Sequence, residues 1–347
     1  MATRYRIEGF PRGWFMVLFS DELAVGAMHK MKYFGRSLMA WRGEDGVARI
    51  MDAHCPHLGA NIAAGGKVEG NTVVCPFHLW RFDTLGQCVE IPYCDGPISK
   101  KATLGSWPVI ERNGMIFVWH HPEGEGPDFD VPSLPNDGSS EWTPWRHHVL
   151  RIKTHSKEIV ENVVDLAHFM PVHGTHVETF VNEFDGHKAI QRTKGTAYPR
   201  GGGKDRFELD AIYYGPGYQI SDMRGYLHSL LVNAHTMIDE HTLDLRFGVS
   251  LKPRGSSEHN DAFAEAYIKN LTTGFLEDVE IWENKVYRDT PLLARSDGPI
   301  MKLRRWYAQF YTQDGPRGAS ATGLQPGGPW QVGRLQSGAA PVDEEEE

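Results

Sequence analysis

The sequence is poor in cysteine, lacks long apolar runs and has no excess of positive charge. Four cysteines in 347 residues are too few for a disulfide scaffold. No segment approaches the roughly 20 apolar residues that cross a bilayer, and the amino terminus has no apolar secretion segment, so we expect a cytoplasmic protein without a membrane span. The formal net charge is −9 and the last five residues are all acidic, so we expect no nucleic-acid partner.

The first part of the chain reads as a small all-β domain. From about Trp14 to Trp119, short strand-like segments such as 115–119 alternate with glycine and aspartate turns. Proline and glycine then cluster between residues 121 and 145, a composition typical of a domain connection. We therefore assign the first domain to residues 1–130.

The second part combines helical and strand patterns. Helical patterns lie at about 156–169 and 261–288. Strand-like stretches lie at 209–214, 227–232 and 243–251. Together they predict an α+β domain with a mostly antiparallel sheet over residues 131–312. From residue 313 the chain is rich in glycine, proline, serine and alanine and then turns acidic, so we expect a disordered tail over 313–347.

The strongest motif is a pair of cysteine–histidine segments, Cys55-Pro-His57 and Cys75-Pro-Phe-His78. Zinc sites with two cysteines and two histidines usually pair like with like along the chain, whereas each segment here offers one thiolate and one imidazole. The mixed arrangement favours a Rieske [2Fe–2S] cluster, in which two cysteines hold one iron and two histidines hold the other. A zinc-binding module is the alternative. The ligand set leaves out His54, Cys88 and Cys94.

A second candidate metal site lies in the predicted helix that starts near residue 156. Apolar residues cover most of its circumference, which predicts a buried helix. Asn162, Asp165 and His168 nevertheless follow one another at three-residue spacing and form a polar stripe on one face. Because buried polar groups need partners, we consider His168 and the nearby His173 as imidazole ligands of a metal. Two hydrogen-bonded core histidines are the alternative.

A non-haem Fe(II) site of the facial type also needs one carboxylate. In the second predicted helix, Asp278 stands three residues after Phe275 and four before Trp282, which places it on the apolar face. Glu277 and Glu280 lie elsewhere around the helix and can be solvated. We therefore expect Asp278 to be the third ligand.

With these motifs the chain resembles the oxygenase components of Rieske non-haem iron oxygenases, from about Trp14 to Tyr311. Segments 165–169, 278–282, 297–300 and 303–307 are similar to those of the 3-ketosteroid 9-alpha-hydroxylase oxygenases. The resemblance implies a helix-grip catalytic domain behind the Rieske domain and a homotrimer assembled head to tail. It also implies that Asn162 and Asp165 belong to the catalytic group, with Asp165 connecting a Rieske histidine of one subunit to His168 of the next.

The resemblance further implies a substrate pocket. Its residues would be Tyr213, Gln219, Ser221, Asn233, Phe275 and Trp282. The chain departs from the subgroup at two of these positions, because Gln219 replaces a methionine and Ser221 an asparagine, so the exact steroid stays open. For Phe275 and Trp282, simple core packing is an equal alternative.

These features predict an enzyme, the oxygenase component that uses O₂ and two electrons to hydroxylate an apolar substrate such as a 3-ketosteroid. The chain has no glycine-rich nucleotide loop, so NAD(P)H would act through a separate flavin and iron–sulfur reductase. Within the same superfamily, an O- or N-demethylase or a sterol desaturase is the alternative. Outside the enzymes, the alternative is a Rieske electron carrier without oxygenase activity.

Overall fold

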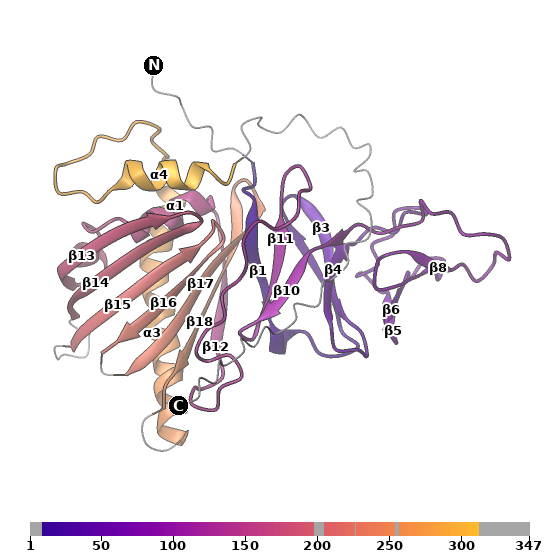
Figure 1. Ribbon diagram of the computed structural model, residues 1–347, viewed down its shortest axis with the longest axis horizontal. Coiled ribbons are helices and arrows are strands. Elements are labelled where there is room, and N and C mark those ends of the chain that lie inside the picture. The colour runs from indigo at the N-terminus through magenta and orange to yellow at the C-terminus, as the bar shows by residue number, and fades with distance from the viewer. Residues whose placement is uncertain (1–8, 198–204, 226, 254–256, 312–347) are drawn as a thin grey trace, which may run out of the picture. The chain divides into compact units, whose positions relative to one another are not determined.

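Short antiparallel strands build the amino-terminal part of the chain, at the right of Figure 1. The computed structural model describes residues 9–197, 205–225, 227–253 and 257–311. The first sheet consists of β1 (Gly13–Phe19), β11 (Met115–His120) and β10 (Val109–Arg112), and a single 3₁₀ turn, η1 (Ser20–Glu22), follows β1. The second consists of β2 (Met28–Tyr33), β3 (Arg36–Arg42), β4 (Ala48–Asp52) and β9 (Ser106–Trp107). The third consists of β5 (Lys67–Glu69), β6 (Thr72–Val74), β7 (Arg81–Phe82) and β8 (Cys88–Glu90).

Strand β1 is apolar throughout because both of its faces are covered. Phe15 and Val17 pack into the core of the amino-terminal domain. Trp14 and Met16 alternate with them and point into a second core shared with the large sheet of the following domain. All seven residues of β1 are therefore buried, which explains a continuous hydrophobic run instead of an alternating one.

A single antiparallel sheet of seven strands forms the centre of the second domain. In spatial order its strands are β12 (Arg146–Ile152), β18 (Thr242–Leu251), β17 (His228–Asp239), β16 (Tyr218–Arg224), β15 (Asp205–Tyr214), β14 (Lys188–Ala197) and β13 (Thr175–Asp185). Its helical segments are α1 (Ser156–Val160), the 3₁₀ turn η2 (Glu161–Val163), α2 (Phe169–His173), α3 (Ser257–Asn284) and α4 (Ile300–Ala308). These elements confirm the predicted α+β class with an antiparallel second sheet.

The central strand β17 shows how the two faces of this sheet differ. Val232 and Ala234 point toward β1 and β11 of the amino-terminal domain. Met237 lies on the opposite face and packs against Val279 and Trp282 of α3. Since side chains alternate along a strand, the odd-numbered positions of β17 line the space between the sheet and the helices. Figure 1 shows α3 crossing this sheet, with α1 and α4 near one end of its strands.

Backbone hydrogen bonds join the two domains at the β2–β3 turn. Phe34 and Gly35 have φ angles of 53° and 70°, as a tight hairpin turn requires. Their amides donate to the carbonyls of Met237 and Ile238, each at 2.9 Å. The hydroxyl of Tyr33 adds a buried hydrogen bond of 2.9 Å to Asp244. The amino-terminal domain is thus hydrogen-bonded to β17, the strand whose side chains line the space between the sheet and the helices.

The structure corrects several predicted element boundaries. The helix predicted over 156–169 is wrong beyond Val163, because the carbonyl of Val163 accepts from the Asn182 side chain at 2.9 Å and the carbonyl of Asp165 pairs with His168. These carbonyls are therefore not available to helical amides. A separate short helix, α2, begins at Phe169, where the prediction ended the helix.

The other differences concern length. Helix α3 ends at Asn284 instead of 288, and β17 continues to Asp239 instead of ending at 232. Strands β13 and β14 were not predicted, because their many charged residues hide the hydrophobic alternation. The tail over 313–347 lies outside the described residues. Among the described residues, no helix has both the length and the apolar character that crossing a membrane requires.

Candidate functional site

Two loops with the same backbone pattern carry the cysteine–histidine segments. The Cys55 amide donates to the carbonyl five residues later at 2.8 Å, and the amide four residues later donates back to Cys55 at 3.0 Å. Cys75 repeats both hydrogen bonds, at 2.9 and 3.1 Å. The residue four places after each cysteine has a positive φ, 77° at Gly59 and 58° at Leu79. Both turns therefore present the thiol from the same position, whereas the imidazole follows Cys55 by two residues and Cys75 by three.

The side chains of these loops converge. Cys55 and Cys75 are free thiols with exposed fractions of 3% and 1%. Burial, with a smaller contribution from the neighbouring Cys75 thiol, raises the pKa of Cys55 to about 11, although a hydrogen bond from the His57 backbone acts to lower this pKa. The ring centroids of His57 and His78 are 4.7 Å apart, and His57 Nδ1 is buried without a hydrogen-bond partner in the described part of the chain. This donor set fits a metal centre, because binding would stabilise the thiolates and satisfy the nitrogen.

The other cysteines and the nearby histidine have different surroundings. His54 is exposed, and its Nδ1 lies 2.9 Å from the carbonyl of Gly59. Cys88 donates to the carbonyl of Glu90 at 3.5 Å, and Cys94 is exposed. The structure thus places these three residues outside the converging set.

Three side chains from two distant segments meet at the second site. His168 directly precedes α2, His173 ends it, and Asp278 lies near the carboxyl end of α3. One potential donor atom of each residue lies within 4.8 Å of the other two. His173 Nε2 is 3.5 Å from Asp278 Oδ2, and the two imidazole centroids are 5.2 Å apart. Two imidazoles and one carboxylate are the donor set of facial non-haem Fe(II) sites.

Two neighbouring residues contact two of these side chains: Asp165 contacts His168, and Asn162 contacts Asp278. His168 Nδ1 lies 2.5 Å from the carbonyl of Asp165 and 3.6 Å from its carboxylate. Nδ1 therefore donates to Asp165, which leaves Nε2 for a metal. The Asn162 side chain hydrogen-bonds the Asp278 carboxylate and favours its charged form.

Burial controls the protonation of the site. It lowers the pKa of His173 to about 4, with a smaller effect of His168, and it also lowers the pKa of His168. Burial raises the pKa of Asp278 to about 7, although the hydrogen bond from Asn162 opposes this shift. Near neutral pH the metal-free site therefore holds two neutral imidazoles and a carboxyl group that readily exchanges its proton for a cation.

Helical spacing predicted the burial around Asp278 correctly. Asp278 is buried at the sheet-facing side of α3, as are Val279 and Trp282, and Glu280 is exposed. The carboxyl group therefore faces the protein interior, where His173 approaches it.

The sequence drew attention to Gly298 only as a member of the segment 297–300, and the structure shows why a glycine stands there. A Cβ at this position would lie 1.6 Å from the carbonyl oxygen of Val164. The Asp297-Gly-Pro-Ile segment can therefore pass directly against the irregular stretch that holds Asp165 and His168. A glycine is required there because of close backbone approach.

Four of the predicted pocket residues share the sheet face beneath the helices. Tyr213 is the register partner of Gln219, and Gln219 is the partner of Asn233, so these three form one row across β15, β16 and β17. Ser221 stands two residues beyond Gln219 on the same face. Trp282 reaches this space from α3 and packs with Met237. The side chain of Phe275 lies outside the described residues.

Sequence reasoning missed His235 on the same face. It stands two residues after Asn233, and its ring centroid is 5.6 Å from that of Tyr213. The strand predicted from the sequence ends at residue 232, whereas β17 continues to Asp239 and so includes His235. Continuing the two-residue period from Asn233 would have identified it.

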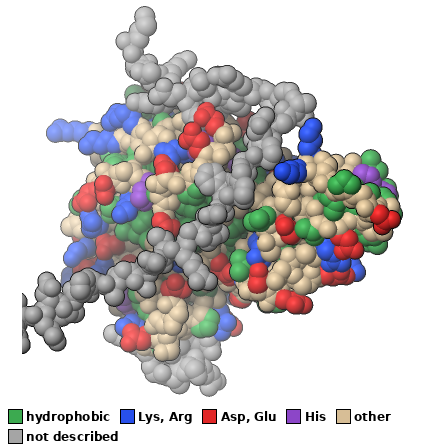
Figure 2. Space-filling view, turned by 45° about the vertical axis from the view of Figure 1, so that its right-hand side comes forward, with side chains coloured by type: hydrophobic (Ala, Val, Ile, Leu, Met, Phe, Trp, Pro, Cys, Tyr) green, Lys and Arg blue, Asp and Glu red, His purple; other side chains and the backbone are tan. Residues whose placement is uncertain are grey.

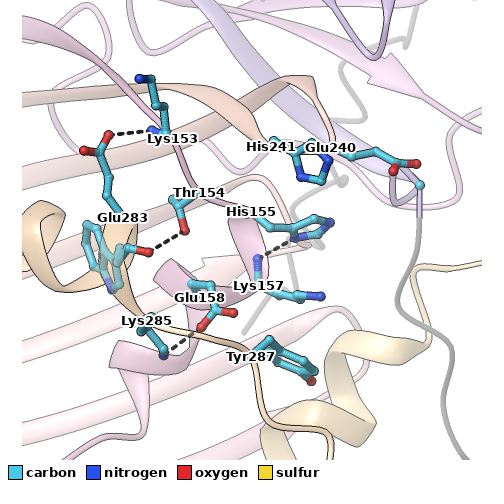
Figure 3. A pocket seen from close by; sticks show the side chains of 12 residues that line it. Lys153, Thr154, His155, Lys157, Glu158, Glu240, His241, Glu283, Lys285 and Tyr287 are labelled. Carbon is cyan, nitrogen blue, oxygen red and sulfur yellow. Dashed lines mark hydrogen bonds and ion pairs between the residues drawn. The ribbon is translucent and has the colours of Figure 1, made fainter.

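A separate cavity of about 460 Å³ adjoins Trp282 (Figure 3). Its wall is polar: Lys285 pairs with Glu158 at 2.7 Å, and the Lys153 amide donates to Glu283 at 2.7 Å. Of the predicted pocket residues whose side chains are described, Trp282 alone lines this cavity. This cavity therefore differs from the apolar substrate pocket that the sequence predicts.

Two family models match successive parts of the chain. The Rieske [2Fe-2S] domain family matches residues 13–108. The family described as the 3-ketosteroid 9alpha-hydroxylase C-terminal domain matches residues 118–311.

Whole-chain relatives give the same result. The 3-ketosteroid-9-alpha-monooxygenase oxygenase component of Rhodococcus rhodochrous is 37% identical over 318 residues, which cover 87% of this chain and 83% of the relative. The protein of the same description from Mycobacterium tuberculosis is 34% identical over 335 residues, covering 90% and 83%. Cholesterol 7-desaturase of Caenorhabditis elegans is 31% identical over 341 residues, covering 89% and 78%. The crystal structure of dicamba monooxygenase bound to dicamba shares the fold with a TM-score of 0.72, at 19% identity over 86% of this chain and 96% of that one.

Proposed function

This chain belongs to the family of 3-ketosteroid 9α-hydroxylase oxygenase components among the Rieske oxygenases, and from that premise we propose that it hydroxylates a 3-ketosteroid. One oxygen atom of O₂ would enter an unactivated C–H bond. The other would leave as water, with two electrons from a separate NAD(P)H-dependent reductase and two protons. The observation that carries the proposal is the convergence of His168, His173 and Asp278 beside the sheet face of the predicted pocket.

Membership in this family confirms the predicted fold class, the enzyme class and the two iron cofactors. It also favours a Rieske cluster over a zinc module for the cysteine–histidine loops. When bound, the cluster supplies electrons one at a time and the ferrous ion supplies the site of O₂ activation. The residues that would hold them are Cys55, His57, Cys75 and His78 for the cluster, and His168, His173 and Asp278 for the single iron.

The residues around the iron ligands have distinct tasks in this proposal. Asp165 holds the proton on His168 Nδ1 and so directs Nε2 toward the metal. Asn162 stabilises the charged carboxylate of Asp278 against the effect of burial. Both residues position ligands that the chemistry requires.

The sheet face beneath the helices would hold and orient the steroid. Tyr213 and Trp282 supply buried aromatic surface. Gln219, Ser221 and Asn233 add polar groups that can distinguish substrates at the same face. Fixing one C–H bond next to the metal lowers the entropic part of the barrier and determines which carbon reacts.

A homotrimer is the assembly that we propose, with the Rieske histidines of one subunit next to Asp165 of another. Among the described residues, no hydrogen bond, ion pair or ring contact joins the cluster histidines to the mononuclear site of the same chain. In Figure 1, β5, β6 and β8 lie far from α1 and β13. A second subunit would supply the missing contact for electron transfer.

The surroundings of the cluster histidines suit such an interface. Apolar side chains around them are 52% to 65% exposed, and they are Leu58, Phe77, Leu79 and Tyr93. Figure 2 shows hydrophobic side chains beside histidine at the right-hand end of the molecule. Exposed apolar surface of this kind is typical of protein contacts. Sedimentation velocity should give a trimer, and Phe77→Asp should shift it toward the monomer while Val25→Asp, at an exposed position elsewhere, should not.

The activity can be tested directly. The protein would be incubated in air with a panel of 3-ketosteroids, NADH and a surrogate reductase, and the products analysed by mass spectrometry with ¹⁸O₂. We expect a product that has gained one labelled oxygen, and none with His168→Ala. Absence of any oxidised steroid from the reduced, iron-loaded enzyme would refute the proposal.

Sterol desaturation is the second candidate, because cholesterol 7-desaturase is among the relatives. The same iron site would then remove two hydrogens from the substrate and release both oxygen atoms as water. A product lighter by two hydrogens and free of ¹⁸O would identify this reaction in the same experiment.

A further inference from the structure

His235 is the most deeply buried ionisable group beneath the helices. It lies in the central strand β17 with no exposed surface, and its ring contacts that of Tyr213 at 5.6 Å between centroids. Asn233 and Met237 flank it at two-residue spacing on the same face. The ring therefore points into the space that the predicted pocket residues share.

Neither ring nitrogen of His235 has a hydrogen-bond partner in the described part of the chain. The hydroxyl of Ser156, which contacts the flanking Met237, already has other partners. Ser156 Oγ pairs with the hydroxyl of Tyr307 at 2.7 Å and donates to Met237 Sδ at 3.3 Å. Asn233 repeats the situation two residues earlier, because its Oδ1 is also buried without a partner.

An unpaired imidazole in a core is unusual, because buried polar groups are nearly always hydrogen-bonded. Leaving one unpaired destabilises the folded protein, because the buried nitrogen loses its hydrogen bonds to water and gains none in return. An apolar side chain at this position would avoid that cost. A group from outside the chain is therefore the natural partner of His235.

The chemistry of the ring indicates what this partner is. Burial lowers the pKa of His235 to about 3, and its own backbone carbonyl only partly opposes the shift. The ring is therefore neutral near pH 7 and carries one N–H donor. A neutral donor beside an aromatic ring, among the predicted pocket residues, suits an uncharged acceptor on a rigid apolar molecule, and a ketone oxygen is such an acceptor.

We propose that His235 is a substrate-anchoring and specificity-determining residue whose ring N–H donates a hydrogen bond to a ketone oxygen of the bound steroid. The inference rests on the proposed steroid substrate. It adds a determinant of orientation: the anchor fixes the position of the ketone, and the rigid ring system then determines which C–H bond faces His168, His173 and Asp278.

The test is anaerobic titration calorimetry of the holoenzyme with three steroids. One carries ketones at C3 and C17, and the other two each lack one of these ketones. In the wild-type protein, loss of the anchored ketone should weaken binding about tenfold, as expected for one lost hydrogen bond that leaves a buried donor unpaired. The analogue that shows the loss identifies which ketone is anchored. In His235→Leu the same comparison should show no difference, and His235→Gln, which keeps a donor, should restore part of it.

Unfolding of the ligand-free variants separates anchoring from a structural role. Because leucine removes two unpaired nitrogens, ligand-free His235→Leu should be at least as stable as the wild type, with an unchanged cluster spectrum. An isotope-edited infrared spectrum of the bound ¹³C=O steroid should show a lower carbonyl frequency in the wild type than in His235→Leu.

Three results would overturn the inference. The first is an equal effect of ketone removal in the wild type and His235→Leu. The second is marked destabilisation of ligand-free His235→Leu. The third is a wild-type protein that binds none of the three steroids, which would also refute the proposed function, whereas the first two leave that function intact.

Discussion

Lowering the pH from 8 to 6 should weaken divalent metal binding at the mononuclear site about tenfold. Burial raises the pKa of Asp278 to about 7 and lowers that of His173 to about 4, and it also lowers the pKa of His168. Across this pH range, therefore, the carboxyl group of Asp278 passes through its pKa, whereas that of His173 lies below the range. It is protonated in roughly a tenth of the metal-free molecules at pH 8 and in about nine tenths at pH 6, so at pH 6 the cation must displace nearly one proton.

Calorimetric titration of metal-depleted protein with Co²⁺ measures both quantities. Repeating each titration in two buffers of different ionisation enthalpy counts the protons released. We expect close to one proton per metal at pH 6 and about 0.1 at pH 8. Asn162→Ala should extend the proton release to higher pH, because it removes the hydrogen bond that favours the carboxylate. Glu280→Gln, at an exposed position of α3, is the matched control and should change nothing.

The same shift predicts the stability of the metal-free protein. Because the folded pKa of Asp278 lies above its ordinary value of 3.8, the folded state holds a proton that the unfolded chain releases. This contribution is fully present below pH 4 and is lost as the pH rises through 7. Between pH 5.5 and 8, the free energy of unfolding should fall by about 2 kcal/mol, and Asp278→Asn should abolish the change.

For the metal-binding prediction, a metal affinity that is equal at pH 6 and 8, or release of two protons at pH 6, would refute the reasoning.

Three further predictions concern single substitutions. His168→Ala should abolish turnover and leave the visible spectrum of the cluster intact. A bleached spectrum would mean that His168 belongs to the cluster and not to the mononuclear site. Asp165→Ala should stop turnover but keep both metals. Iron affinity should fall at most about tenfold, because the backbone carbonyl that holds His168 remains. Normal turnover would refute the proposed electron path. Gly298→Ala should lower the unfolding free energy by more than about 2 kcal/mol in thermal melts, because its Cβ would collide with the Val164 carbonyl. Gly274→Ala, with open space in α3, should instead stabilise by about 0.5–1 kcal/mol, and equal effects of the two glycine substitutions would contradict the packing argument.

The short spacing within each cysteine–histidine segment was sufficient to predict that its two side chains lie close together. Cys55 and His57 lie in one turn, and so do Cys75 and His78, so covalent geometry alone brings each pair together. The burial of Asp278 followed from helical periodicity, because its helix is regular around that position.

The stretch from Val164 to His168 could not be predicted in the same way. Its sequence has helical periodicity, but two residues distant along the chain interrupt the helix: Asn182 donates to the carbonyl of Val163, just before the stretch, and Gly298 packs against the carbonyl of Val164. These tertiary contacts outweigh a propensity difference of less than about 1 kcal/mol per residue. The spacing of His168 from Asp165 nevertheless remained useful, since the turn that replaced the helix keeps the two residues in contact.

The amino-acid sequence by itself determined which residues offer thiols, imidazoles and carboxylates, and their spacings predicted two kinds of metal site. Tertiary structure alone decided that Asp278 approaches His173 across more than a hundred residues of chain, that Tyr213, Gln219 and Asn233 align in one row, and that His235 lies unpaired beside them. The physical reason is the distance along the chain over which each effect acts. Bond geometry and periodicity act over a few residues, whereas strand register and helix packing depend on burying apolar surface from the whole chain at once.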